Sequence, residues 1–122
     1  MKTEITALVH CETETEQIGL QQIATRLPFR LSLLFMNLTG SGIRQKISKN
    51  PDIIILDMWD ADTDYSLPHK IKLFAPHIPL LLLLPEVPES FIYFLRSVMV
   101  DKILQKPFSQ HAFESAIRQL IH

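Results

Sequence analysis

Short apolar runs alternate with segments of helical periodicity along the whole chain. Two of the runs, residues 53–56 and 80–84, are apolar at every position. A run that is apolar on both faces is typical of a central strand in a parallel sheet covered by helices. Residues 29–35 alternate in part between apolar and polar, which predicts a strand nearer the sheet edge. Residues 5–9 and 102–105 complete a set of five predicted strands.

Helical segments lie between these runs. Thr13 followed by Glu16 has the spacing of a capping box and predicts the start of the first helix. Apolar residues follow there at helical spacing: Leu20, Ile23, Ala24 and Leu27. Further helices are predicted around residues 43–47, 66–74, 90–99 and 109–120. Five strands that alternate with five helices predict one three-layer α/β domain with a parallel sheet.

Composition narrows the class of protein. A chain of 122 residues with 47% apolar and 20% charged residues is typical of one globular domain. The formal net charge of −1 provides no basic surface for nucleic acid or for an anionic membrane. The longest apolar run is too short to span a bilayer, and the single cysteine, Cys11, excludes an internal disulfide. We therefore expect a cytoplasmic protein that contacts neither a membrane nor nucleic acid directly.

The carboxyl ends of the strands are where a parallel sheet of this kind carries its chemistry. Asp57 ends the third predicted strand and Lys106 follows the fifth. Their surroundings, NPDIIILD at 50–57 and ILQKPF at 103–108, resemble the receiver domain of two-component response regulators over essentially the whole chain. The resemblance implies a (βα)5 flavodoxin-like fold with the strand order 2-1-3-4-5. It also implies that any output domain would lie outside residues 1–122.

The resemblance assigns roles to two residues. Asp57 is the candidate phosphoacceptor, and Lys106 is the switch lysine that pairs with the carboxylate or with the phosphate. An acyl phosphate adds charge, which an ammonium group can hold. By the same resemblance the domain is not itself an enzyme, and its partner is a sensor histidine kinase or another signalling protein.

The metal site of receivers is altered in this sequence. Receivers end their first strand with two acidic residues that hold Mg²⁺ together with the phosphoacceptor. His10 and Cys11 stand at these positions, and imidazole and thiol are poor ligands for a hard cation. Glu12 lies one position late. We therefore expect no metal, and Mg²⁺ only if Glu12 and Asp57 still form a functional site.

Two further positions depart from the receiver pattern. Leu84 stands where receivers have a Thr or Ser whose hydroxyl bonds the phosphate, and Leu has no hydrogen-bond donor. Ile103 stands in place of the usual aromatic residue before the lysine. Together these departures predict a pseudo-receiver that is phosphorylated weakly or not at all. The alternative is a conventional receiver phosphorylated on Asp57, which would control an output domain.

Other interpretations of these residues stay open. His10 and Cys11 could bind a soft metal, but one pair is half a zinc site and no second pair has matching spacing. Asp57 could be a structural partner of Lys106. Trp59 is expected to cover Asp57, and the following acidic segment is expected to be a solvated loop: Asp60, Asp62 and Asp64. A small-molecule binder or enzyme is disfavoured because the chain lacks a Gly-rich phosphate loop.

An aromatic stripe marks the fourth predicted helix. Phe91, Tyr93 and Phe94 span nearly three sides of a helix and cannot all face a core. Exposed apolar residues suggest a partner surface. We expect homodimerisation through the face formed by residues 90–99, 102–105 and 109–120, which is a common dimer face in receivers.

Overall fold

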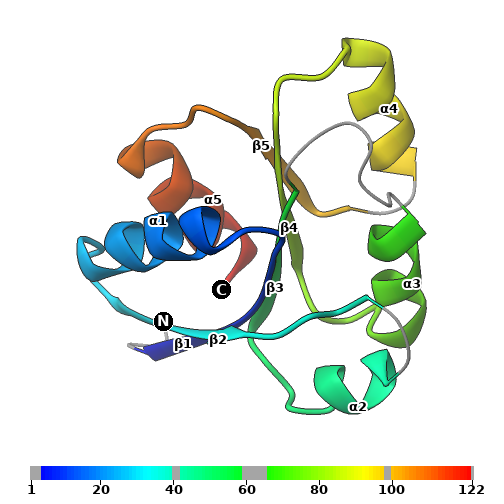
Figure 1. Ribbon diagram of the computed structural model, residues 1–122, viewed down its shortest axis with the longest axis horizontal. Coiled ribbons are helices and arrows are strands. Elements are labelled where there is room, and N and C mark those ends of the chain that lie inside the picture. Colours follow the sequence, from blue (N-terminus) through cyan, green and yellow to red (C-terminus); the bar gives the residue numbers. More distant parts are fainter. Residues whose placement is uncertain (1–3, 40–41, 59–65, 98–99, 122) are drawn as a thin grey trace.

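The computed structural model of the protein describes residues 4–39, 42–58, 66–97 and 100–121. Five parallel strands form one sheet with the order β2-β1-β3-β4-β5, which confirms the expected fold and places β2 at an edge (Figure 1). The strands are β1 (Glu4–Cys11), β2 (Arg30–Phe35), β3 (Ile53–Asp57), β4 (Leu80–Leu84) and β5 (Lys102–Gln105). The helices are α1 (Glu14–Thr25), α2 (Ile43–Ile47), α3 (Ser66–Phe74), α4 (Glu89–Ser97) and α5 (Gln110–Leu120).

Helices cover both faces of the sheet. The helices α1 and α5 lie on one face, and α2, α3 and α4 lie on the other (Figure 1). Alternate residues of β3 therefore enter different cores: Ile53 and Ile55 pack on the α1 and α5 side, whereas Ile54 and Leu56 pack on the opposite side. The apolar runs at 53–56 in β3 and 80–84 in β4 are buried at every position, as predicted, and Asp57 at the end of β3 is buried too.

The predicted helix caps are confirmed at two positions. Thr13 is the N-cap of α1, and its hydroxyl oxygen accepts a hydrogen bond from the backbone N–H of Glu16 at 3.2 Å. Ser109 is the N-cap of α5, where its hydroxyl accepts from the backbone N–H of Ala112 at 3.0 Å. The cap of α1 places the first turn of that helix directly above the carboxyl end of the sheet.

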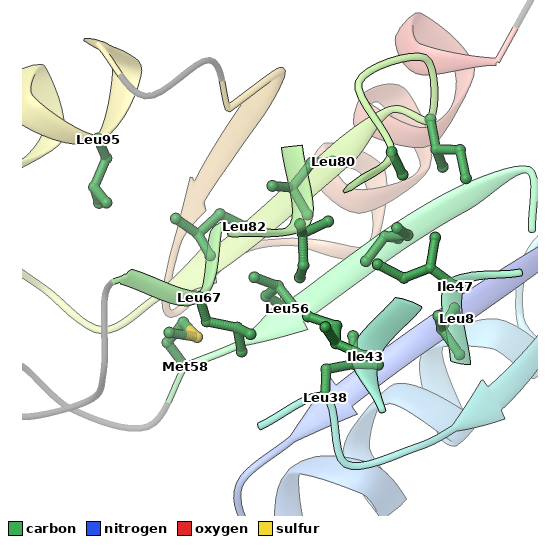
Figure 2. Close-up of a cluster of buried hydrophobic side chains, with 14 of the residues drawn as sticks. Leu8, Leu38, Ile43, Ile47, Leu56, Met58, Leu67, Leu80, Leu82 and Leu95 are labelled. Carbon is green, nitrogen blue, oxygen red and sulfur yellow. The ribbon is translucent and has the colours of Figure 1, made fainter. Parts of the chain in front are cut away.

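Figure 2 shows the apolar cluster between the sheet and the helices α2, α3 and α4. Leu56 and Met58 of the β3 segment, Leu82 of β4 and Leu67 of α3 converge there. Among its described residues, α4 buries only Leu95, which enters this cluster. The attachment of α4 to the domain therefore depends on few side chains.

A buried lysine joins α3 to the start of β5 at the end of the sheet opposite Asp57. Lys72 is 8% exposed, and its Nζ donates hydrogen bonds to the carbonyl of Ile78 at 3.0 Å and to Asp101 Oδ2 at 2.9 Å. The same oxygen of Asp101 accepts a hydrogen bond from the backbone N–H of Leu80 at 2.8 Å. One carboxylate thus satisfies two donors from different elements.

We predict that Asp101→Ala lowers the free energy of unfolding by about 2 kcal/mol, because it leaves a buried ammonium group and a backbone N–H without this acceptor. Urea unfolding followed by circular dichroism measures the change. The control is Glu114→Gln, which removes a surface ion pair within α5 and is expected to cost less than about 0.5 kcal/mol. Equal effects of the two substitutions would contradict the role given to Asp101.

Candidate functional site

The structure brings Asp57 and Lys106 together at the carboxyl edge of the sheet. Asp57 is the last residue of β3 and is 4% exposed. Lys106 follows β5, where its backbone N–H donates to the carbonyl of Leu84 at 2.7 Å, and its peptide bond to Pro107 is cis. The ammonium group of Lys106 forms an ion pair with Asp57 Oδ1 and donates a hydrogen bond to the carbonyl of Met58 at 3.0 Å.

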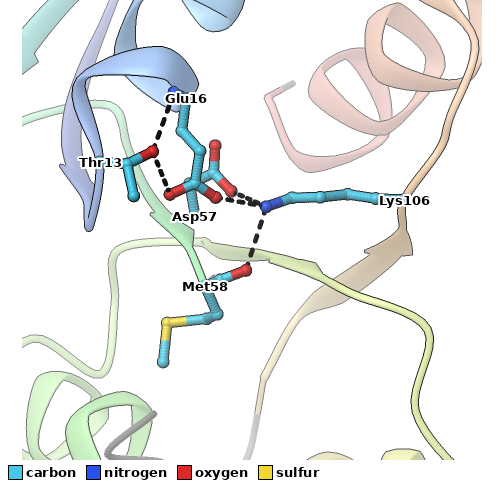
Figure 3. Close-up of polar contacts among 5 residues, drawn as sticks. All are labelled: Thr13, Glu16, Asp57, Met58 and Lys106. Carbon is cyan, nitrogen blue, oxygen red and sulfur yellow. Dashed lines mark hydrogen bonds and ion pairs between the residues drawn. The ribbon is translucent and has the colours of Figure 1, made fainter. Parts of the chain in front are cut away.

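A second carboxylate shares this lysine. Glu16, in the first turn of α1, accepts a hydrogen bond from Lys106 Nζ at 2.6 Å through Oε2 (Figure 3). Its other oxygen accepts a hydrogen bond from the hydroxyl of Thr13 at 3.1 Å. The side chain of Glu16 is 8% exposed, so this carboxylate belongs to the site and not to the solvated helix surface.

The spacing of Glu16 from Thr13 predicted a capping residue, but it did not predict the contact of Glu16 with Lys106. The signal that could have found it is its position: the first turn of the helix after β1 lies at the same sheet edge as Asp57. In a capping box the Glu side chain reaches back to the N-cap backbone. Here it bonds the N-cap hydroxyl and extends across to Lys106 instead.

The three charged groups alter one another's protonation. Burial, together with the hydrogen bond to Glu16, raises the pKa of Asp57 to about 7. Burial acts to raise the pKa of Glu16 too, but its hydrogen bonds with Asp57 and Lys106 outweigh burial and hold that pKa below the usual value. Burial opposes the charged form of Lys106, yet the contacts with both carboxylates raise the pKa of the ammonium group. The raised pKa places the titration of Asp57 near neutral pH, so the site loses this proton as the pH rises above about 7.

His10 and Cys11 lie on opposite faces of β1. Cys11 is paired in register with Asp57 and packs against the core under α1 and α5. Burial, followed by the nearby charge of Asp57, raises the pKa of the Cys11 thiol to about 12, so the thiol is neutral. His10 lies on the other face, is 5% exposed, and accepts a hydrogen bond from the backbone N–H of Leu38 at 3.1 Å through Nδ1. Burial lowers the pKa of His10.

The residues at the site do not fit the Mg²⁺ that the receiver resemblance implies. Mg²⁺ requires near-octahedral oxygen coordination. The site provides two carboxylates, both already engaged by Lys106, and a neutral thiol at the register position beside Asp57. Within the described parts of the chain, no group of three or more His, Cys, Asp or Glu residues could hold a metal ion.

The remaining sequence-predicted positions lie apart from the charged cluster. Leu84 is fully buried in the apolar cluster with Leu95, and Ile103 packs against the same cluster. Glu12 lies in the loop after β1, on an exposed position outside the Lys106 ion pairs. The hypothesis that Trp59 covers Asp57 concerns a residue outside the described ones. The acidic segment 60–64 lies outside them as well.

An elongated groove opens beside the charged cluster. It has a volume of about 340 Å³ and runs between α1 and the segment after β5. Its walls are mainly apolar, with Leu20 and Ile23 on one side and Pro107 and Phe108 on the other. The lining residues with charged side chains are Glu16, Asp57 and Lys106.

Solved structures match the chain over nearly its whole length, although no protein-family model and no curated protein sequence matches it. A response regulator receiver domain protein from Clostridium thermocellum is 18% identical with a TM-score of 0.78, covering 96% of this chain and 94% of that one. A response regulator receiver protein from Pseudoalteromonas atlantica is 15% identical with a TM-score of 0.76, covering 94% and 95%. A protein described as pilus assembly-related from Burkholderia pseudomallei is 17% identical with a TM-score of 0.73, covering 98% and 91%.

At these identities the likeness establishes the fold: the chain has the three-layer fold of response regulator receiver domains. In addition, no helix in the described residues is long and apolar enough to cross a membrane.

We predict that Asp57→Asn changes stability in a pH-dependent way. Because the folded-state pKa of Asp57 is raised from 3.8 to about 7, the native fold binds its proton more tightly than the unfolded chain does. That contribution is present at low pH and is lost as pH rises through about 7. The Asn variant should therefore gain about 2–3 kcal/mol relative to the native protein between pH 5 and pH 8.

Urea unfolding of both proteins at several pH values measures this difference. Glu16 titrates below this window because its pKa is lowered from 4.5. A difference between the two proteins that is constant from pH 5 to pH 8 would show that Asp57 is ionised throughout.

Proposed function

We propose that the protein is a receiver-like signalling domain of a two-component system that acts through protein contacts, with weak or no Mg²⁺-dependent phosphorylation. The observation that carries the proposal is the sharing of Lys106 between Asp57 and Glu16. The receiver fold and the Asp57–Lys106 pair support the signalling class. The second carboxylate and the neutral Cys11 support the loss of phosphorylation.

The charges at the site are the reason why we expect weak or no phosphorylation of Asp57. In a receiver the switch lysine neutralises the incoming phosphoryl group. Here Glu16 Oε2 lies 2.6 Å from Lys106 Nζ and already supplies that lysine with a second anion. A phosphoryl group on Asp57 would add charge beside Glu16, in a buried site without the two acids that hold a metal in receivers. In addition, Leu84 provides no hydroxyl to bond the phosphate.

We predict that incubation with acetyl phosphate and Mg²⁺ gives no stoichiometric adduct by intact mass. The matched variant is Cys11→Asp, which places a carboxylate at the register position beside Asp57 and is expected to increase any adduct. An adduct in the native protein that is lost in Asp57→Asn would contradict the proposal. It would favour the alternative function, a conventional receiver phosphorylated on Asp57 by a histidine kinase.

The surface of α4 supports contact with another protein. Tyr93 is 79% exposed and Phe94 is 54% exposed, although both are large aromatic residues. Phe91 and Phe94 place their ring centroids 6.3 Å apart and line a shallow hollow with Val87 and Pro88. Exposed aromatic residues at interfaces often supply most of the binding energy. The α4–β5–α5 face is therefore our proposed surface for a second copy of the chain, with a sensor histidine kinase as the upstream partner.

We predict that Phe94→Glu lowers the mass measured by light scattering from that of a dimer to that of a monomer. The reason is that a charge placed in an apolar interface must be desolvated without a partner. The control is Leu73→Glu, which changes an exposed apolar residue of α3, 65% exposed, outside the proposed face. The proposal of a dimer fails if the native protein is monomeric at all concentrations, or if Leu73→Glu has the same effect as Phe94→Glu.

A further inference from the structure

The groove beside the charged cluster has the features of a ligand site. Its volume of about 340 Å³ lies at the lower end of the range of small-molecule pockets. Its charged end lies at the carboxyl edge of the sheet, where Asp57 ends β3 and Lys106 follows β5. Ligands of open α/β sheets bind at the carboxyl ends of the strands. The position of the groove does not indicate which kind of ligand it binds. That must be inferred from the residues that line it.

The groove is lined by apolar residues and, at one end, by charged residues. Leu20, Ile23, Pro107 and Phe108 provide apolar walls. Gly19 contributes no side chain, and a Cβ added there would have no atom within 4 Å. Gly19 therefore leaves open space in the lining of the groove.

The charged end carries an excess of negative charge. Two carboxylates, Asp57 and Glu16, face the single ammonium group of Lys106, and both are less than one tenth exposed. Asp57 Oδ1 is buried and forms an ion pair with Lys106 Nζ. Within the described residues, no group donates a geometrically well-formed hydrogen bond to this oxygen. The site therefore has one negative charge more than it has positive charge when all three groups are ionised.

We propose that this groove binds a small molecule with an apolar body and one basic amine group. The amine is placed at Asp57 and Glu16, and the apolar body lies between α1 and Phe108. A monovalent cation matches the excess of one negative charge, whereas a divalent metal would lack a third anionic ligand. Binding there would connect α1 to the β5–α5 segment and would give the domain an input that does not require phosphoryl transfer.

A small molecule fits better than a side chain presented by a folded protein. The two carboxylates line the groove together with residues of α1 and Phe108, and their side chains are only 5% and 8% exposed, which favours a slender ligand over a folded protein. The inference goes beyond the proposed function, because it depends neither on the α4 surface nor on the reactivity of Asp57.

The test is a titration of amide chemical shifts at pH 8 with phenethylamine as the probe. The uncharged matched probe is 2-phenylethanol, which has the same apolar body. We expect phenethylamine to bind with a dissociation constant on the order of 1 mM, with the largest shifts around Gly19 and Asp57. The alcohol should bind at least about tenfold more weakly, because it cannot pair with the excess carboxylate.

Substitutions in the groove test whether the amine binds there. Gly19→Leu fills the groove and should abolish saturable binding, whereas Gly19→Ala leaves space and should retain it. Both substitutions raise helix propensity and should preserve the fold. Asp57→Asn should remove the preference for the amine over the alcohol. Equal affinity for the two probes in the native protein, or amine binding that Gly19→Leu leaves unchanged, would overturn the proposal. Neither outcome affects the adduct and light-scattering tests of the proposed function.

Discussion

The arrangement of the site depends on one ammonium group. Lys106 Nζ contacts the carboxylate of Asp57 from β3, the carbonyl of Met58 in the segment after it, and the carboxylate of Glu16 from α1. A single lysine thereby joins the end of β5, the end of β3 and the first turn of α1. Since these contacts are largely shielded from water, breaking one of them leaves charge uncompensated. The charged cluster is both the candidate functional site and the junction of three elements.

This junction places two carboxylates and one ammonium group at the carboxyl edge of a receiver fold. In this structure Glu16 provides an internal anion for Lys106, and burial raises the pKa of Asp57 to about 7. The register partner of Asp57 is a neutral thiol, and His10 is bonded to the backbone at Leu38 on the other face of β1. The proposed inputs are therefore protein contacts and an amine ligand.

Most of the fold could be predicted from the sequence because it depends on local periodicity. The runs at 53–56 and 80–84, the cap at Thr13 and the cap at Ser109 all specify their elements directly. The Lys72–Asp101 pair could not be predicted, because its partners come from different elements and meet only after folding. The role of Glu16 was missed for a related reason: its spacing to Thr13 already explained it as a cap, so nothing local required a partner 90 residues away.

A double-mutant cycle between Glu16 and Lys106 tests this account most directly. Urea unfolding at pH 8 is compared for the native protein, Glu16→Gln, Lys106→Met and the double variant. If the two side chains interact as the structure shows, their coupling energy is about 1 kcal/mol or more in favour of the native pair. A coupling energy below about 0.3 kcal/mol, within the additivity of independent sites, would contradict the account.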